Sequence, residues 1–215
     1  MKAIMAHPEL QLQSVVGGVA LLERYGNIEG LMEEDGIPIH SKFHMIVEGE
    51  TPTTMAKSTG LGLIDVSMIF DNLKPDVVVI VGDRFDVLAP AIAAAYMNIP
   101  VAHTMGGEVS GTIDESIRHA ITKFAHIHFP ATEDARNRLI RLGENPEYIF
   151  NVGCPSIDTI VQTPKIDKKS LEKKFNIDFS QPSILLIQHP VTTESDASRS
   201  QILTTIEAIK EMGIQ

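Results

Sequence analysis

The sequence predicts an α/β protein built on a doubly wound, Rossmann-like parallel sheet. Residues 77–81 read Val-Val-Val-Ile-Val, a continuous β-branched run of the kind found in parallel strands buried on both faces. Apolar runs of strand length alternate with helix-like segments through residues 1–162, which is the pattern of repeated βα units. A polar stretch then precedes a new strand–helix pair. We therefore expect a first domain at 1–162, a linker at 163–182 and the start of a second domain at 183–215.

The individual elements follow from periodicity and from glycine or proline breaks. The helix at 53–72 is expected to bring Ile64, Met68 and Ile69 onto one face with Leu73. Residues 37–47 read as an extended piece. The other expected helices are 21–34, 84–97, one starting at Asp114 or Ser116 and running to 125, 132–142, 156–161 and 199–212. The expected strands are 10–16, 77–81, 99–103, 127–130, 148–153 and 183–188.

Composition excludes several classes of partner. The formal net charge of −10 argues against a general binder of nucleic acid, which needs a basic face. The most apolar segment, 87–102, is broken by Pro90 and Pro100 and is shorter than a membrane span. Cys154 is the single cysteine, which excludes an internal disulfide and fits a reducing compartment. With no signal-peptide stretch at the start, we expect a cytoplasmic protein without membrane or nucleic-acid partners.

Asp83 and Arg84 directly follow the predicted strand at 77–81. Ligands of open parallel sheets bind outside the carboxyl ends of the strands, so a carboxylate and an arginine here suit a phosphorylated ligand. The alternative is structural: Asp83 caps the next helix and Arg84 forms an ion pair beside it. The sequence leaves both interpretations open.

A glycine-rich loop, Gly106 to Gly111, follows the next predicted strand. It matches neither the P-loop nor the dinucleotide fingerprint. Three acids, Glu108, Asp114 and Glu115, lie in or just after it, and carboxylates near one cleft can divide acid and base roles. The alternative is that Asp114 caps the following helix while Glu115 complements its dipole.

Several histidines are candidate ligands. His126 and His128 lie on the same side of an extended segment, but no third ligand has convincing spacing, so we expect no metal and no cofactor. His119 and Lys123 share a helix face, whereas Arg118 points elsewhere. His189 ends the predicted strand at 183–188, a position that suits either a phosphate ligand or a simple turn.

Together these motifs resemble the UDP-N-acetylglucosamine 2-epimerase family, most closely its hydrolysing branch, which serves sialic acid biosynthesis. The resemblance rests on four ordered segments, 82–86, 106–123, 152–158 and 188–193. It implies the N-terminal domain of a glycosyltransferase-B-type fold, followed by the start of a C-terminal nucleotide-binding domain. The family's first strand and most of its second domain are expected to be missing.

The resemblance also implies a reaction. UDP is eliminated across C1–C2 of UDP-N-acetylglucosamine, and water adds to the 2-acetamidoglucal to give N-acetylmannosamine. Non-hydrolysing relatives instead return UDP-N-acetylmannosamine, and an inactive remnant that binds nucleotide sugar is the other alternative. Where many relatives hold a catalytic glutamate, this chain has Met105. The implied catalytic residues are Asp83, Glu108, Asp114 and His189, and the implied substrate contacts are Arg84, Gly106, Gly107, Ser110, Arg118 and His119. A homo-oligomer, either a dimer or a tetramer, is expected.

Overall fold

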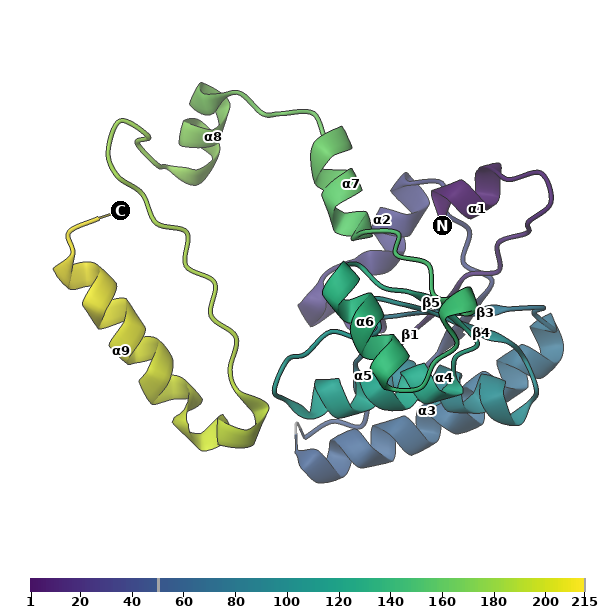
Figure 1. Ribbon diagram of the computed structural model, residues 1–215. Helices are drawn as coiled ribbons and strands as arrows, with labels where there is room; N and C mark the ends of the chain where they lie inside the picture. The colour runs from purple at the N-terminus through teal and green to yellow at the C-terminus, as the bar shows by residue number, and fades with distance from the viewer. Residues whose placement is uncertain (50, 215) are drawn as a thin grey trace. The chain divides into compact units, whose positions relative to one another are not determined.

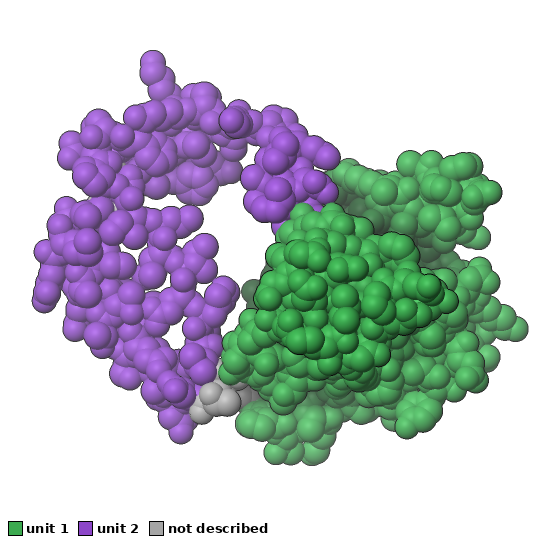
Figure 2. Space-filling model, in the orientation of Figure 1, with its two compact units in different colours: residues 1–154 green, residues 155–215 purple. Residues whose placement is uncertain are grey.

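The computed structural model describes residues 1–49 and 51–214, and they form two compact units. Unit 1 covers Met1–Cys154 and unit 2 begins at Pro155 (Figure 2). The boundaries expected near 162 and 182 stay predictions. No helix in the described part of the chain is long and apolar enough to cross a membrane.

Unit 1 contains parallel sheets, which confirms the α/β prediction. Strands β3 (Val78–Val81), β4 (Val101–Thr104) and β5 (Ile127–Phe129) pair in that order, and each pair is parallel. A separate parallel pair consists of β1 (Val15–Gly17) and β2 (Ser41–Phe43). Since β3 and β4 run in the same direction, the loops that follow them emerge at the same edge of the sheet.

Helices α3 (Pro52–Leu73), α4 (Phe85–Tyr96) and α5 (Ile113–Phe124) lie along one side of these strands (Figure 1). Thr51 and Thr54 form a reciprocal capping box at the start of α3. Small residues let α3 and α4 approach closely: a Cβ at Gly62 would lie 3.2 Å from the Ala89 Cβ. The core between helices and strands includes Val66, Phe70, Ile80, Ala91, Val101 and Ile121.

The prediction that β3 is buried on both faces was wrong. Burial alternates along β3, and Val79 and Val81 are 48% and 62% exposed, so this strand is covered on one face only. On α3, Ile64 and Met68 are 61% and 64% exposed, whereas Ile69 packs partly buried against the core. The buried residues of this helix are Ser58, Gly62, Val66 and Phe70, whose small members permit the contact with α4.

The N-terminal part of unit 1 is more broken than periodicity predicted. The chain begins with α1 (Lys2–Ala6), and the expected helix at 21–34 divides into η1 (Gly18–Leu21), η2 (Glu23–Tyr25) and α2 (Ile28–Glu34). Gly26 has a φ of 110°, outside the helical region, and Asn27 restarts the helix by accepting from the Gly30 amide.

The end of unit 1 is largely helical. The helix predicted at 132–142 is confirmed as α6 (Glu133–Arg141), and the Thr132 side chain caps it. The strand expected at 148–153 is not formed: η3 (Pro146–Tyr148) occupies its start, and only Ile149 makes a parallel bridge, to His128.

Unit 2 contains α7 (Pro155–Gln162), α8 (Lys168–Phe175), η4 (Thr192–Ala197) and α9 (Ser198–Glu211). The helices predicted at 156–161 and 199–212 are confirmed, while α8 lies inside the expected linker. The prediction of a strand at 183–188 is wrong, because this segment pairs with no other strand among the described residues. Hydrogen bonds within a helix form locally, whereas a strand requires a partner.

Candidate functional site

The carboxyl ends of β3 and β4 are joined by an ion pair between Asp83 and Arg118. Gly82, with a φ of 86°, turns the chain out of β3 so that Asp83 follows it directly. Arg118 Nη2 of α5 donates to Asp83 Oδ2, and the two side chains are 8% and 23% exposed. Asp83 does not cap α4, whose N-cap residue is Arg84, so the structural alternative considered for Asp83 is wrong.

Arg118 also holds the glycine-rich loop that follows β4. Its Nη1 donates to the Glu108 carbonyl at 2.8 Å and reaches the Ser110 hydroxyl at 3.5 Å. Burial lowers the pKa of Arg118, yet a guanidinium remains charged at any pH at which proteins are folded. One cation therefore connects the loops that follow two neighbouring strands, which is the convergence expected of a site at this edge.

Asp114 lies in the first turn of α5 rather than at its cap. The N-cap residue is Thr112, so the predicted capping role of Asp114 is wrong. Its carboxylate accepts only a long 3.5 Å contact from the Thr112 hydroxyl among the bonds described. Asp114 precedes Arg118 by four residues, so the two positions lie on the same face of α5, while the Arg118 guanidinium itself pairs with Asp83.

Glu115 fixes the glycine-rich loop, a role that sequence reasoning missed. Its Oε2 accepts from the backbone amides of Ser110 and Gly111, both at 2.8 Å. The hydrogen bonds from these amides, of which that from Gly111 has the larger effect, lower the pKa of Glu115. His119 Nε2 lies 3.9 Å from the other carboxylate oxygen. The sequence does carry a signal for this role: an acid that follows a glycine turn by a few residues, a spacing similar to that of a capping box.

Gly106 and Gly107 are buried, and packing explains why neither position carries a side chain. A Cβ at Gly107, where φ is 82°, would lie 2.4 Å from the Ala135 carbonyl oxygen. Arg138 donates to the Gly107 carbonyl from α6. Glu108 accepts from the Thr132 hydroxyl at 3.4 Å. These contacts hold the loop against α6, and the predicted ligand contacts of the glycines stay predictions.

Arg84 is the N-cap residue of α4, and His189 belongs to unit 2. The Arg84 side chain is exposed, and its Nε lies 3.8 Å from Asp86 Oδ1. A Cβ at Gly18 would lie 2.7 Å from Asp86 Oδ2, so the chain after β1 meets the start of α4. His189 is exposed in the extended segment of unit 2. Its predicted role stays a prediction.

His128 lies beside a carboxylate. His128 is buried, and its Nε2 lies 3.3 Å from Glu144 Oε2, while Lys123 Nζ lies 2.6 Å from Oε1 of the same carboxylate. Burial lowers the pKa of His128 more than Glu144 raises it. No group of three or more potential metal ligands occurs among the residues that the structure describes.

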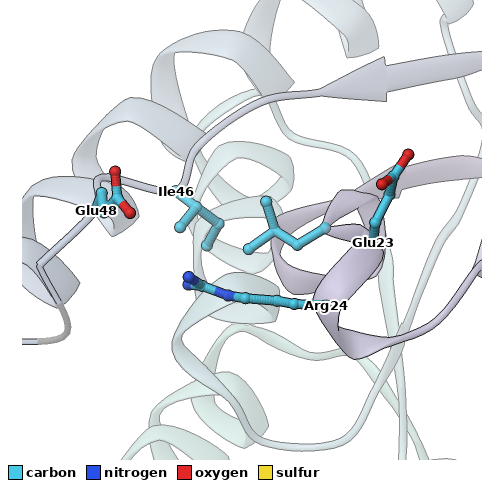
Figure 3. A pocket seen from close by; sticks show the side chains of 5 residues that line it. Glu23, Arg24, Ile46 and Glu48 are labelled. Carbon is cyan, nitrogen blue, oxygen red and sulfur yellow. The ribbon is translucent and has the colours of Figure 1, made fainter.

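A shallow hollow of about 360 Å³ lies elsewhere in unit 1, beyond the ends of β1 and β2 (Figure 3). Its lining combines apolar and charged side chains of both signs. The lining residues are Leu22, Glu23, Arg24, Ile46 and Glu48, none of which was predicted as a site residue.

Carboxylates, an arginine and glycine turns at the strand ends of a parallel sheet define an α/β protein of the Rossmann-like class. The family model described as UDP-N-acetylglucosamine 2-epimerase matches residues 2–214. This chain therefore belongs to the UDP-N-acetylglucosamine 2-epimerase family.

The relatives include enzymes named as hydrolysing. The chain is 38% identical over 215 residues to a UDP-N,N'-diacetylbacillosamine 2-epimerase (hydrolyzing) of Legionella pneumophila, covering 100% of this chain and 57% of the relative. It is 33% identical over 202 residues to a GDP/UDP-N,N'-diacetylbacillosamine 2-epimerase (hydrolyzing) of Campylobacter jejuni, covering 94% and 52%. The chain thus spans between half and three-fifths of the length of these curated relatives.

A solved structure supports the fold. The UDP-GlcNAc 2-epimerase from Neisseria meningitidis bound to UDP-GlcNAc superposes with a TM-score of 0.79 at 19% identity. The match covers 98% of this chain and 58% of the other. This likeness confirms the expected glycosyltransferase-B type of architecture.

Proposed function

We propose that this chain contributes the carboxylate-bearing domain of a hydrolysing 2-epimerase that converts UDP-N-acetylglucosamine and water to N-acetylmannosamine and UDP. Family membership over residues 2–214 supports the reaction class. The observation that carries the proposal is the Asp83–Arg118 pair, because it holds two successive strand-end loops together.

The proposed chemistry proceeds in two steps. A base removes the C2 proton while the bond from C1 to the UDP oxygen breaks, leaving a C1=C2 double bond. Water then adds its hydroxyl to C1 and a proton to C2 on the opposite face. Both steps need a carboxylate near C2 and a cationic or hydrogen-bonding group near the leaving diphosphate.

The structure favours different roles for the two aspartates. Asp83 is paired with Arg118, so its carboxylate is already engaged by the guanidinium. Asp114 has only the long contact with Thr112, so we assign proton transfer to Asp114 and the orientation of Arg118 to Asp83. Glu108 is the second proton-transfer candidate, and Arg84 and His189 are the proposed diphosphate contacts.

The test is turnover of UDP-N-acetylglucosamine by the 215-residue chain in deuterated water. We expect UDP release and N-acetylmannosamine carrying deuterium at C2. Retention of UDP on the epimerised sugar would assign the chain to the non-hydrolysing reaction instead. A folded sample that neither binds nor converts the nucleotide sugar would exclude the proposal for this chain.

Matched substitutions separate the aspartates. Asp114→Asn is expected to slow UDP release by about 10² to 10⁴-fold, the usual contribution of an acid–base group. Asp83→Asn should impair both binding and rate because Arg118 loses its partner. Asp76→Asn, an exposed aspartate just before β3, is the control and should retain the parent rate.

A second substrate is favoured by the relatives. The Legionella pneumophila and Campylobacter jejuni proteins are both named for N,N'-diacetylbacillosamine nucleotides. We therefore propose UDP-N,N'-diacetylbacillosamine as the alternative substrate. Comparing kcat/KM for the two nucleotide sugars decides between them, and a ratio above about tenfold either way identifies the preferred one.

We also propose that the protein is a cytoplasmic homo-oligomer, either a dimer or a tetramer. The exposed apolar face of α3, formed by Leu61, Ile64 and Met68, supports association with a second copy. Sedimentation analysis should show the oligomer, and Ile64→Glu should shift it toward monomer. An unchanged assembly in that variant would place the interface elsewhere.

A further inference from the structure

His103 is a buried histidine that the proposed reaction does not use. It lies in β4, paired in register with Ile80 of β3 and His128 of β5, and its exposure is 0%. Fully buried histidines need a partner for each polar nitrogen or a reason for lacking one.

The hydrogen bond of His103 determines which nitrogen carries the proton. Its Nε2 lies 2.9 Å from the Gly82 carbonyl oxygen, and a carbonyl can only accept, so Nε2 donates. Burial lowers the pKa of His103 to about 4, which leaves the ring neutral at pH 7. A neutral ring has one N–H, so Nδ1 is bare, and no hydrogen-bond partner of that buried atom is found among the described residues.

The opposite edge of the same ring faces the second loop. A Cβ at Gly106 would lie 3.0 Å from His103 Nδ1 and 3.3 Å from Thr122 Oγ1. The backbone of the glycine-rich loop at Gly106 therefore lies against the Nδ1 edge of the imidazole. His103 contacts the turn before Asp83 through Nε2 and the loop leading to Glu108 through its Nδ1 edge.

We propose that His103 is a positioning residue that orients Asp83 toward Arg118 by donating a hydrogen bond from Nε2 to the Gly82 carbonyl. This inference rests on the proposed function and adds a residue to its machinery. Gly82 has a left-handed φ, and the hydrogen bond from His103 stabilises its carbonyl in that turn. His103 touches no substrate atom in this role and acts through the backbone preceding Asp83.

A purely packing role makes a different prediction. If the ring only filled space, an apolar side chain of similar size would replace it without consequence for the turn. If Nε2 positions the turn, the replacement must supply a donor at the same place. Gln presents an amide N–H at a similar distance from Cβ, whereas Met does not.

The first test uses the unaltered chain. Nitrogen-15 NMR of labelled histidine at pH 7 should show His103 neutral, with Nε2 protonated and Nδ1 bare, assigned by loss of the signal in His103→Gln. A ring protonated on Nδ1 with Nε2 bare would overturn the proposal, because the Gly82 carbonyl would then lack its donor.

The second test compares variants by amide hydrogen exchange. His103→Met should speed exchange about tenfold at the Val87 and Leu88 amides, which donate to the Arg84 carbonyl just after this turn, the change expected from one lost hydrogen bond. His103→Gln should restore most of the protection. The matched pair His44→Met and His44→Gln, at an exposed histidine, should change neither amide. Equal exchange in both His103 variants and the parent would contradict the proposal.

Turnover supplies a third measurement that also separates the two proposals. In an active sample, His103→Met should lower kcat for UDP release about 10²-fold with little change in KM, and His103→Gln should regain most of it. If no sample releases UDP, the proposed function fails while the NMR and exchange results still decide the role of His103. Equal kcat values in the parent and in His103→Met would show that His103 does not contribute to the reaction.

Discussion

Units 1 and 2 are stabilised in different ways. Unit 1 has buried side chains in every strand and in α3, α4 and α5, with a core that includes Val66, Val101 and Ile121. None of the described residues of unit 2 whose exposure is given is buried, although α7, α8 and α9 are regular helices. The helices of unit 2 therefore depend on local signals, such as the Asp167 cap of α8, rather than on tertiary burial.

Amide hydrogen exchange tests this difference most directly. We expect amides of β3 and β4 to exchange only through global unfolding, with protection of about 10³-fold or more, while amides of α8 and α9 exchange at close to free-peptide rates. Comparable protection in both units would show that unit 2 has stabilising contacts that burial does not reveal.

A pair of leucine substitutions measures the same contrast in free energy. Leu139 in α6 is 0% exposed and Leu185 in unit 2 is 87% exposed. Leu139→Ala should lower the free energy of unfolding by about 3 kcal/mol, through lost burial and the cavity that remains. Leu185→Ala should change it by less than about 0.5 kcal/mol. Urea denaturation followed by circular dichroism gives both values.

Acid should destabilise unit 1 through its buried histidines. The pKa of His103 is lowered from 6.5 to about 4, so between these values the unfolded chain binds more protons than the folded one. Stability is full above pH 6.5 and falls toward pH 4, by about 3 kcal/mol for this group. His128, whose pKa is also lowered by burial, changes stability in the same direction.

Urea midpoints at pH 7.5, 5.5 and 4.5 measure this dependence. His103→Gln should flatten it, and His44→Gln should leave it as in the parent. A steeper fall in His103→Gln than in the parent would contradict the assignment.

The smallest predicted effect concerns Met105, which has a φ of 60° just after β4. This left-handed conformation strains most side chains but not glycine. Met105→Gly should therefore raise the free energy of unfolding by about 0.5–1 kcal/mol, measured by urea denaturation. Asn98, with a φ of 57°, tolerates this conformation better, so Asn98→Gly should give a smaller change.

The sequence predicted the parallel β3–β5 sheet and its connecting helices because each has a strong local pattern. It predicted Asp83 and Arg118 as site residues but not their pairing, since that contact joins residues far apart in the chain. The role of Glu115 as a ligand of loop amides was missed for another reason: its partners are only four and five residues away, but the conformation of the glycine-rich loop does not follow from a periodic pattern. Segment 183–188 shows the opposite error, because strong β-propensity cannot form a strand without a partner.

The outward valines of β3 have a consequence for handling the protein. Val79 and Val81 leave part of a sheet face exposed, and β3 pairs only with β4 in the sheet described. Such a surface favours edge-to-edge association between molecules, which the net charge of −10 opposes by mutual repulsion. Added salt screens that repulsion over about 8 Å at physiological ionic strength, so colloidal stability should decline as salt rises.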